Sequence, residues 1–270
     1  MKLNILISTY NQGIDNVEKI VAIKRHDIEY KVSHQVTDEK YEIIPASLKR
    51  NDIDVMQSRG RGISKNRNMS IDMASGEICL IADDDVTYLQ LGLEKILAEF
   101  KKDPNLDVLV GQIQTPSGQP QYKKYPQHEK RLGYASIGGV SSIEIAFKLR
   151  SIRDNNIRFD ERFGIGSNMY SRGEEIIFLG DCIKKRLKVK YFPIPFVCHE
   201  YQSSGKKCVY NEEDAKYYGA LLMRIFGKFA YLLLVVIWIK HHKYFKAISL
   251  NKYITSFSEG IHSIMRKSEG

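Results

Sequence analysis

The stretch EICLIADDD, residues 77–85, decides the fold class of this chain. Its first six residues are almost wholly apolar, which is typical of a strand buried on both faces of a parallel sheet. Three aspartates follow where that strand ends. Short apolar runs alternate with helical spacings on either side of it, and this alternation indicates an α/β domain with a mixed, mostly parallel central sheet flanked by helices.

Apolar runs and helical periodicity predict the other elements. Strands are predicted at residues 3–8, 29–35, 54–57, 106–111 and 189–192, and helices at residues 15–24, 64–74, 91–101 and 174–185. Within the glycine-broken SRGRG, residues 58–62, the RGRG of residues 59–62 is interpreted as a phosphate-facing or solvated loop. Residues 115–130 form a long polar segment with three prolines, and loops of that length are usually functional or mobile.

The composition excludes several classes of protein. With 270 residues, 43% of them hydrophobic and 27% charged, the chain lies near the globular average, which argues against a disordered, collagen-like or coiled-coil protein. The start, MKLNILISTYNQ, becomes polar too soon for a signal peptide, so we expect the domain to begin at residue 1. The four cysteines lack CxxC spacing, and we interpret them as reduced thiols of a cytosolic protein: Cys79, Cys182, Cys198 and Cys208.

The aspartates at residues 83–85 carry the sharpest chemical signal. Three carboxylates at the end of a buried strand repel one another, and a bound divalent cation relieves that repulsion. In an extended segment Asp83 and Asp85 point the same way, so the pair can face one Mg²⁺ or Mn²⁺, ions that typically share their coordination with a diphosphate. The alternative interpretation is a run of helix N-cap residues.

Five motifs in order along the chain resemble those of the family 2 glycosyltransferases with the GT-A fold. They are STYN (residues 8–11), RGISKNRNMSIDMASGEICLIADDD (61–85), FDERFGIGS (159–167), GEE (173–175) and PFVCHE (195–200). The resemblance covers roughly residues 1–205. It implies a GT-A nucleotide-diphospho-sugar transferase fold, a nucleoside diphosphate sugar as donor, and a metal held by the DxD-type motif.

The resemblance also implies a role for individual residues. The catalytic base would be Glu175, and the metal ligands would be Asp83, Asp85 and His199. The donor would contact Thr9, Tyr10, Gln35, Arg67, Asn68, Asp83 and Asp84.

Three of these implied roles have alternatives. The family's second strand usually ends in an aspartate pair, whereas here it ends in Ser33, His34 and Gln35, with Asp38 later, so the residue that reads the nucleobase stays open. Residues 174–175 can also be exposed glutamates that favour the helix dipole. His199 can also be a buried, hydrogen-bonded core histidine.

The C-terminal part of the chain is basic and apolar. A helical extension, residues 211–270, is predicted to follow a catalytic domain, residues 1–210, and residues 201–270 carry 11 Lys/Arg against 5 Asp/Glu. Residues 229–239 are uninterrupted apolar residues, short of the roughly 20 needed to span a bilayer. A tryptophan within this run and the lysines after it, Lys240, Lys243 and Lys246, favour peripheral contact with an anionic membrane. A helix packed in the core is the alternative.

Taken together, these features predict a metal-dependent, inverting glycosyltransferase at the inner, cytoplasmic face of the cell membrane. Its donor would be a UDP-sugar and its acceptor a glycan or lipid-linked glycan of surface polysaccharide synthesis. One alternative is a metal-dependent nucleotidyltransferase, for which STYNQG, residues 8–13, is a poor phosphate loop. The other is a basic nucleic-acid-binding protein. We expect no nucleic acid partner, because the positive charge is concentrated beside an apolar segment.

Overall fold

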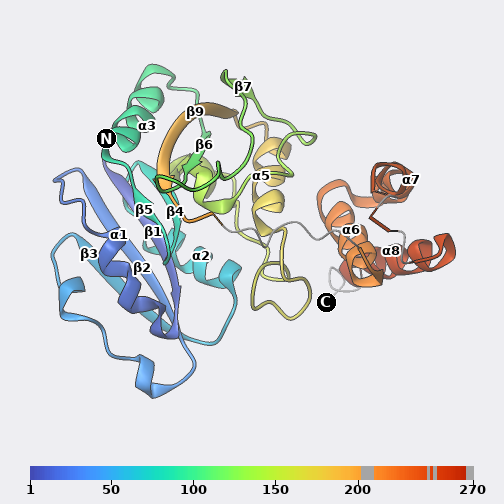
Figure 1. Ribbon diagram of the computed structural model, residues 1–270, viewed down its shortest axis with the longest axis horizontal. Coiled ribbons are helices and arrows are strands. Elements are labelled where there is room, and N and C mark those ends of the chain that lie inside the picture. Colours follow the sequence, from blue (N-terminus) through green and yellow to red (C-terminus); the bar gives the residue numbers. More distant parts are fainter. Residues whose placement is uncertain (202–209, 242–243, 246–247, 266–270) are drawn as a thin grey trace. The chain divides into compact units, whose positions relative to one another are not determined.

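The computed structural model describes residues 1–201, 210–241, 244–245 and 248–265. The chain divides into two compact units, Met1–Tyr201 and Gln202–Gly270 (Figure 1). The division predicted after residue 210 differs from this one only by residues 202–210, and 202–209 lie outside the described residues.

The first unit is built on a mixed sheet, which has nine strands within the described residues. The neighbours β3, β2, β1 and β4 all run parallel, and β8 enters antiparallel beside β4. This arrangement confirms the predicted α/β class. In sheet order the strands are β3 (Ile53–Arg59), β2 (Ile28–Val36), β1 (Leu3–Tyr10), β4 (Ile78–Asp83), β8 (Ile145–Lys148), β6 (Val108–Gln114), β9 (Val189–Cys198) and β5 (Thr87–Tyr88), with β7 (Lys130–Arg131) paired to β9.

Helices cover both faces of the sheet (Figure 1). One face packs on α1 (Val17–Ile20) and α3 (Gln90–Lys102), and the other on α2 (Ile63–Met73), α4 (Leu149–Asp154) and α5 (Glu174–Lys184). Strand β1 serves both layers, since Leu3, Ile5 and Ile7 join the first cluster while Leu6 joins the second. A strand buried on both faces is apolar throughout rather than alternating, which is why β1 and β4 were recognisable in the sequence. The remaining short 3₁₀ turns are η1 (Asn11–Asn16), η2 (Glu39–Tyr41), η3 (Ala46–Leu48) and η4 (Ser142–Glu144).

The helix predicted at residues 15–24 is mostly wrong. The segment forms the 3₁₀ turn η1 followed by the single helical turn α1. The two turns bury Ile14, Val17 and Ile20, the apolar residues whose spacing suggests a helix. The turn places Gly13 directly beside Asp84. A Cβ added at Gly13 would overlap the Asp84 carboxylate, so this position requires glycine.

Other predicted elements hold with shifted ends. Helices α2, α3 and α5 confirm the three helices predicted at residues 64–74, 91–101 and 174–185. Strand β9 continues six residues beyond the predicted end at residue 192, and strand β8 was not predicted, because four residues carry too little periodicity. The thiols of Cys79, Cys182 and Cys198 are free, and Cys208 lies outside the described residues.

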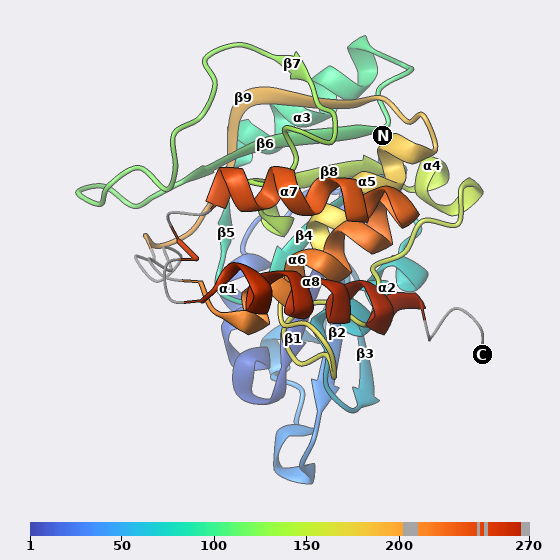
Figure 2. The same cartoon turned by 90° about the vertical axis from the view of Figure 1, so that its right-hand side faces the viewer.

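The second unit is a small helical bundle (Figure 2). Helix α6 (Glu212–Phe226) leads through the 3₁₀ turn η6 (Gly227–Phe229) to α7 (Ala230–His241), and α8 (Leu250–Met265) follows. Helices α6 and α8 approach closely at Gly219 and Gly260, where an added Cβ would overlap a backbone carbonyl oxygen of the other helix. Among the described residues, one helical stretch, Glu212–His241, is long and apolar enough to cross a membrane, and 17% of its apolar window is buried.

Candidate active site

A pocket of about 290 Å³ opens where three parallel strands end. The register sets Ser8 of β1 beside Asp83 of β4, and Tyr10 beside Gln35 of β2. The carboxyl ends of parallel strands are the usual ligand site of open α/β sheets. The lining residues are Ser8, Thr9, Tyr10, Gln35, Arg61, Gly62, Ile63, Asn66, Arg67, Asp83, Asp84, Asp85, Ile165 and Glu174.

Arg67 joins the aspartates to the acidic pair. Its Nη2 donates to Asp83 Oδ1 at 2.7 Å and to Ser142 Oγ at 2.8 Å, and its Nη1 donates to Glu174 Oε1 at 2.8 Å. Burial by itself disfavours the guanidinium charge, yet Asp83 and Glu174 raise the pKa of Arg67 above its ordinary value. Two carboxylates that would repel each other are therefore held on one cation.

Asp84 turns away from this network toward β1. Its Oδ2 accepts a hydrogen bond from Thr9 Oγ1 at 2.6 Å. Burial raises the pKa of Asp84, while the Thr9 hydroxyl works in the opposite direction. Asp84 thus makes a structural contact with strand β1. Its contact with a donor stays a prediction.

Asp85 pairs with His199. The Nε2 of His199 lies 3.2 Å from Asp85 Oδ2, and Nδ1 lies 2.6 Å from the Glu200 carbonyl oxygen. The hydrogen bond to Asp85 raises the pKa of His199 and lowers that of Asp85. The ring of Tyr122, from the long loop, packs edge-on against the imidazole at 5.7 Å between centroids.

The three aspartates do not form the extended segment that the sequence pattern assumed, although Asp83 and Asp85 both line the pocket. Strand β4 ends at Asp83, and the next two residues turn. Asp83 therefore meets Arg67 while Asp85 meets His199. Within the part of the chain that the structure describes, no three His, Cys, Asp or Glu side chains converge closely enough to hold a metal by themselves.

Glu174 and Glu175 begin α5 after Gly173, which adopts φ 94°. Glu174 is buried against Arg67 and lines the pocket, whereas Glu175 is partly buried beside it. Burial and the neighbouring Glu174 charge raise the pKa of Glu175 to about 8. The pair is thus divided, since Glu174 is held by a guanidinium while the pKa of Glu175 lies near neutral pH, where a general base is effective.

Four buried polar atoms in this pocket lack a hydrogen-bond partner in the protein. Five such side-chain atoms occur among the described residues, and four belong to residues that line this one pocket. Buried polar groups are normally satisfied, so these atoms indicate a polar ligand. They are Ser8 Oγ, Gln35 Nε2, Asn66 Oδ1 and Arg67 Nε.

The structure brings most predicted donor residues together and leaves out others. Asn68 lies outside the lining, because its amide exchanges hydrogen bonds with the main chain of Phe159 at 2.9 Å. Glu175 and His199 are also not among the lining residues. Gln35 lies in the pocket, whereas Asp38 caps the turn η2 instead.

Several lining residues escaped the sequence prediction. Ser8, Asn66 and Ile165 lie inside or at the edge of the motifs quoted for the resemblance, but nothing in their spacing marks the direction of a side chain. Arg61 belongs to the SRGRG segment, and its guanidinium lies 5.9 Å from the centre of the Tyr10 ring. The glycines around it were the available signal.

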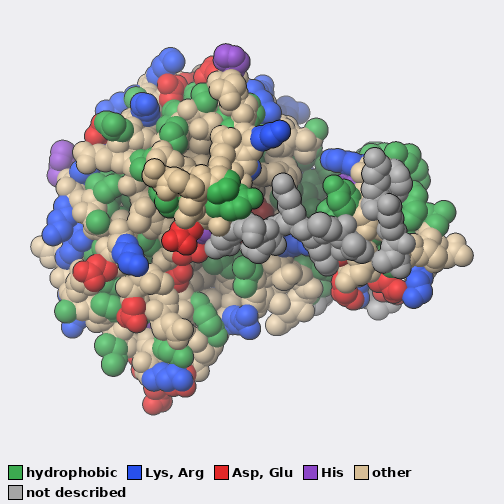
Figure 3. Space-filling model, in the orientation of Figure 1, with side chains coloured by type: hydrophobic (Ala, Val, Ile, Leu, Met, Phe, Trp, Pro, Cys, Tyr) green, Lys and Arg blue, Asp and Glu red, His purple; other side chains and the backbone are tan. Residues whose placement is uncertain are grey.

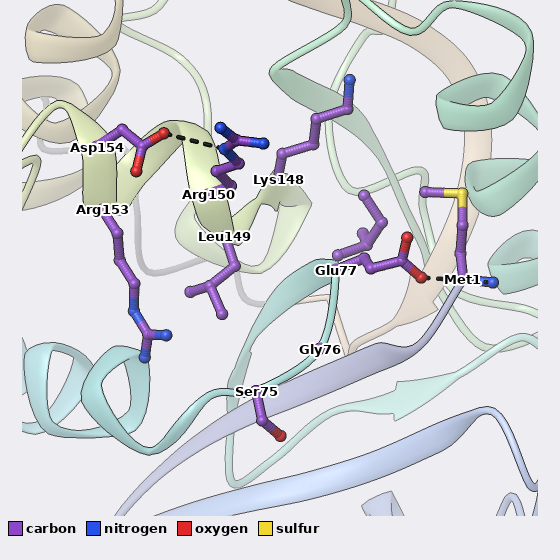
Figure 4. Close-up of a pocket in the computed structure, with 10 residues that line it drawn as sticks. Met1, Ser75, Gly76, Glu77, Lys148, Leu149, Arg150, Arg153 and Asp154 are labelled. Atoms are coloured by element: carbon purple, nitrogen blue, oxygen red, sulfur yellow. Dashed lines mark hydrogen bonds and ion pairs between the residues drawn. The ribbon is translucent and has the colours of Figure 1, made fainter.

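A larger cavity, about 510 Å³, lies at the opposite, amino ends of β1 and β4 (Figure 4). Its charged groups are paired with one another or with the main chain: Glu77 with the N-terminal amine at 3.6 Å, Arg150 with Asp154 at 3.2 Å, and Arg153 with the carbonyl oxygens that end α2. No residue that lines it carries an unpartnered buried side-chain atom among the described residues. The smaller pocket is therefore the stronger candidate site.

Comparison with known proteins identifies the family of the chain. The model of the family described as glycosyl transferase family 2 matches residues 5–174, a range that contains every lining residue. No curated protein sequence matches the chain.

Solved structures show the same fold. The crystal structure of S. aureus TarS superposes with a TM-score of 0.61 at 17% identity, covering 97% of this chain and 49% of that one. For TarS 1-349 in complex with UDP-GlcNAc the TM-score is 0.63 at 17% identity, covering 97% of this chain and 82% of that one. For TarS 1-349 in complex with UDP the TM-score is 0.57 at 16% identity, covering 98% of this chain and 83% of that one. The chain spans about half the length of TarS. The predicted GT-A fold is confirmed.

Proposed function

This chain belongs to glycosyl transferase family 2, and from that premise we propose that it transfers a sugar from a UDP-sugar to a hydroxyl group with inversion of the anomeric carbon. The acceptor is a glycan or lipid-linked glycan of surface polysaccharide synthesis. The observation that carries the proposal is the set of four unpartnered polar atoms in the pocket at the ends of β1, β2 and β4.

The donor end of the site is built for a nucleotide. Gln35 and Ser8 offer donors, Asn66 offers an acceptor, and Arg61 stands beside the exposed ring of Tyr10. A nucleobase and ribose present donors, acceptors and a flat face, so they match this lining. That TarS structures of the same fold were solved with UDP-GlcNAc and with UDP supports UDP as the nucleotide.

The residues around Asp85 fit a divalent cation. Asp85 and His199 already lie within 3.2 Å of each other, and carboxylate oxygen with imidazole nitrogen is a suitable donor set for Mn²⁺. Two protein ligands leave positions for waters and diphosphate oxygens, and Asp83 lines the same pocket as Asp85. When bound, Mn²⁺ or Mg²⁺ would stabilise the negative charge on the departing UDP.

Glu175 is the proposed base. As the acceptor oxygen attacks the anomeric carbon, the bond from that carbon to the UDP oxygen breaks, and the hydroxyl proton passes to the Glu175 carboxylate. Glu174 is less suited, because its Oε1 is held by Arg67 at 2.8 Å. The raised pKa of Glu175 makes it the stronger proton acceptor of the two.

Family membership weakens the two alternatives that the sequence left open. A nucleotidyltransferase or a nucleic-acid-binding protein would need its own recognition site. The pocket instead lies wholly within residues 5–174, the part of the chain that matches the glycosyl transferase family model. The net positive charge is instead concentrated in the second unit, where residues 202–270 carry 11 Lys/Arg against 5 Asp/Glu.

A thermal-shift panel tests the proposal. The full chain is melted with UDP-GlcNAc, UDP-glucose and GDP-mannose, each with Mn²⁺ and with EDTA. A UDP-sugar at 100 times its Kd is expected to stabilise the fold by about 2.7 kcal/mol, and EDTA should weaken the shift. Ser8→Ala should reduce the shift, and Ser75→Ala, which lies at the other cavity, should not. A panel without any UDP-dependent shift would refute the proposal.

A further inference from the structure

Helix α7 exposes an apolar face to solvent. Its inward side packs in the core of the second unit. Ala230 is fully buried in that core, and Leu233, Leu234 and Ile237 are partly buried against the core. Its outer side chains are between 53% and 72% exposed. In Figure 3, hydrophobic side chains gather where Figure 1 shows α7. The outer face of α7, as we define it, consists of Leu232, Val235, Val236 and Ile239 of the helix together with Phe229, the last residue of the turn η6 before it.

A surface helix normally carries polar residues on its solvent side. Here positions 229, 232, 236 and 239 follow helical spacing on one side, with 235 between them, so the five side chains form one stripe. Contiguous exposed apolar surface of this kind marks a site of interaction with a protein or a membrane. The outer face of α7 is therefore a docking surface, and its charge decides the occupant.

The charged side chains at the ends of α7 are basic. Residues 215–258 contain seven Lys/Arg and no Asp or Glu, and two of these cations, Lys216 and Lys252, pair with Glu259 and Glu212 outside that stretch. Lys228 and Lys240 stand at the two ends of the helix. A second copy packed on this face would bring these lysines next to each other in either helix direction, because a two-fold interface uses the same patch twice. An anionic surface would neutralise them instead.

The dimensions favour a helix that lies along a surface. The outer face extends over ten residue steps, roughly 15 Å at the α-helical rise, which is about half the thickness of a bilayer core. Gly227, at φ 59°, and the turn η6 divide the apolar stretch Glu212–His241 into α6 and α7. Helix α6 begins with Glu212, Glu213 and Asp214 and packs against α8.

We propose that the outer face of α7 binds the surface of a membrane that contains anionic lipids, with the helix axis parallel to that surface. This binding places the protein at the cytoplasmic face of the cell membrane. The inference is independent of the proposed glycosyl transfer. In the sequence, the tryptophan is among the features that favour membrane contact. In the structure Trp238 packs inward instead, 4.7 Å from Tyr253 and 6.1 Å from Phe245 between ring centroids, so the aliphatic residues and Phe229 form the contact face. Of the lysines that the sequence prediction invoked, Lys243 and Lys246 lie outside the described residues.

Vesicle co-sedimentation of the full chain tests the inference. The probes are vesicles of phosphatidylcholine alone and of phosphatidylcholine mixed with phosphatidylglycerol. The protein should sediment with the mixed vesicles, and salt should weaken this binding. Leu232→Gln combined with Val236→Gln should lower the partition coefficient at least about tenfold. Leu91→Gln should leave it unchanged, because Leu91 is equally exposed, at 72%, but lies on α3.

Two further measurements keep the result decisive. Lys228→Gln with Lys240→Gln should weaken binding to the mixed vesicles without touching the apolar face, so the inference stays testable if the first double variant fails to fold. Light scattering then examines the second copy as occupant. The inference is overturned if the wild-type chain ignores the mixed vesicles, if it binds neutral vesicles equally well, or if the apolar substitutions convert a dimer to a monomer.

Discussion

The pocket at the ends of β1, β2 and β4 and the outer face of α7 depart from ordinary protein surfaces in opposite ways. In the pocket, Ser8, Gln35, Asn66 and Arg67 are almost completely buried, yet each keeps a polar atom without a partner in the protein. On α7, large apolar side chains are more than half exposed. One region withholds polar atoms from water, and the other presents apolar atoms to it.

The two departures differ in what they do to stability. A buried polar atom without a partner costs about 1–3 kcal/mol of folding free energy, so such atoms persist where a ligand uses them. An apolar side chain that is exposed in both the folded and the unfolded chain costs the fold almost nothing, and its effect falls on association instead. Substitutions in the two regions should therefore have different signatures, which the following predictions compare in order of size.

The largest effect is expected from Glu175→Gln. Removal of a positioned general base typically lowers the rate about 10²- to 10⁴-fold, so transfer should fall by that factor in a steady-state assay. The donor-induced thermal shift and vesicle binding should stay normal, because neither region of the comparison is touched. Glu18→Gln, at an exposed position on α1, is the control. Near-normal turnover would transfer the role of base to Glu174.

Gly219→Ala should destabilise the second unit by about 1–3 kcal/mol in chemical unfolding. The new methyl group would overlap the carbonyl oxygen of Phe257 on α8, and this clash outweighs the roughly 1 kcal/mol that alanine gains in helix propensity. Gly138→Ala, where nothing lies near the added Cβ, is the matched control. Equal stability of both variants would show that the α6–α8 contact is looser than the structure indicates.

The pH dependence should separate catalysis from stability. Burial and the charge of Glu174, itself held by Arg67, raise the pKa of Glu175 to about 8. Because the base acts only when deprotonated, transfer should rise up to about tenfold per pH unit below 8 and then level off. The folded state binds the Glu175 proton more tightly than the unfolded state does. The contribution of this proton to the stability of the fold is therefore lost as pH rises toward 8. A rate that falls over this range would contradict the assignment.

Ser8→Ala should stabilise the protein and weaken its site at once. The Ser8 hydroxyl is buried without a partner, so its removal should raise the free energy of unfolding by about 1 kcal/mol without nucleotide. The Kd for UDP should rise about 2- to 10-fold. Ser33→Ala is the control, because the Ser33 hydroxyl donates to the Asn66 carbonyl oxygen at 2.8 Å and its loss should destabilise. Equal losses in both variants would remove the distinction.

The smallest effect is expected from Leu232→Gln. Since Leu232 is 72% exposed, the free energy of unfolding should change by no more than about 0.5 kcal/mol. Leu222→Gln, in the buried core of the same unit, should be strongly destabilising. A large loss from Leu232→Gln would mean that the outer face of α7 is covered in the folded protein.

Local patterns were enough to predict much of the first unit. Strands β1 and β4 and helices α2, α3 and α5 follow from apolar runs and helical spacing, because burial on one or two faces leaves a periodic trace. The helix predicted at residues 15–24 failed, since the same apolar spacing fits a 3₁₀ turn followed by one helical turn. Asn68, predicted to contact the donor, lies outside the pocket lining and hydrogen-bonds to the main chain of Phe159, 91 residues away.

The sequence by itself determined the α/β class, the family motifs and the position of the aspartates at the end of a buried strand. The structure decided which groups meet: Arg67 with Glu174, and Asp85 with His199, pairs that lie 107 and 114 residues apart. It also decided which side of α7 remains exposed and that Trp238 faces inward. Such contacts leave no local periodicity, because they form only when the sheet register and helix packing bring distant segments together.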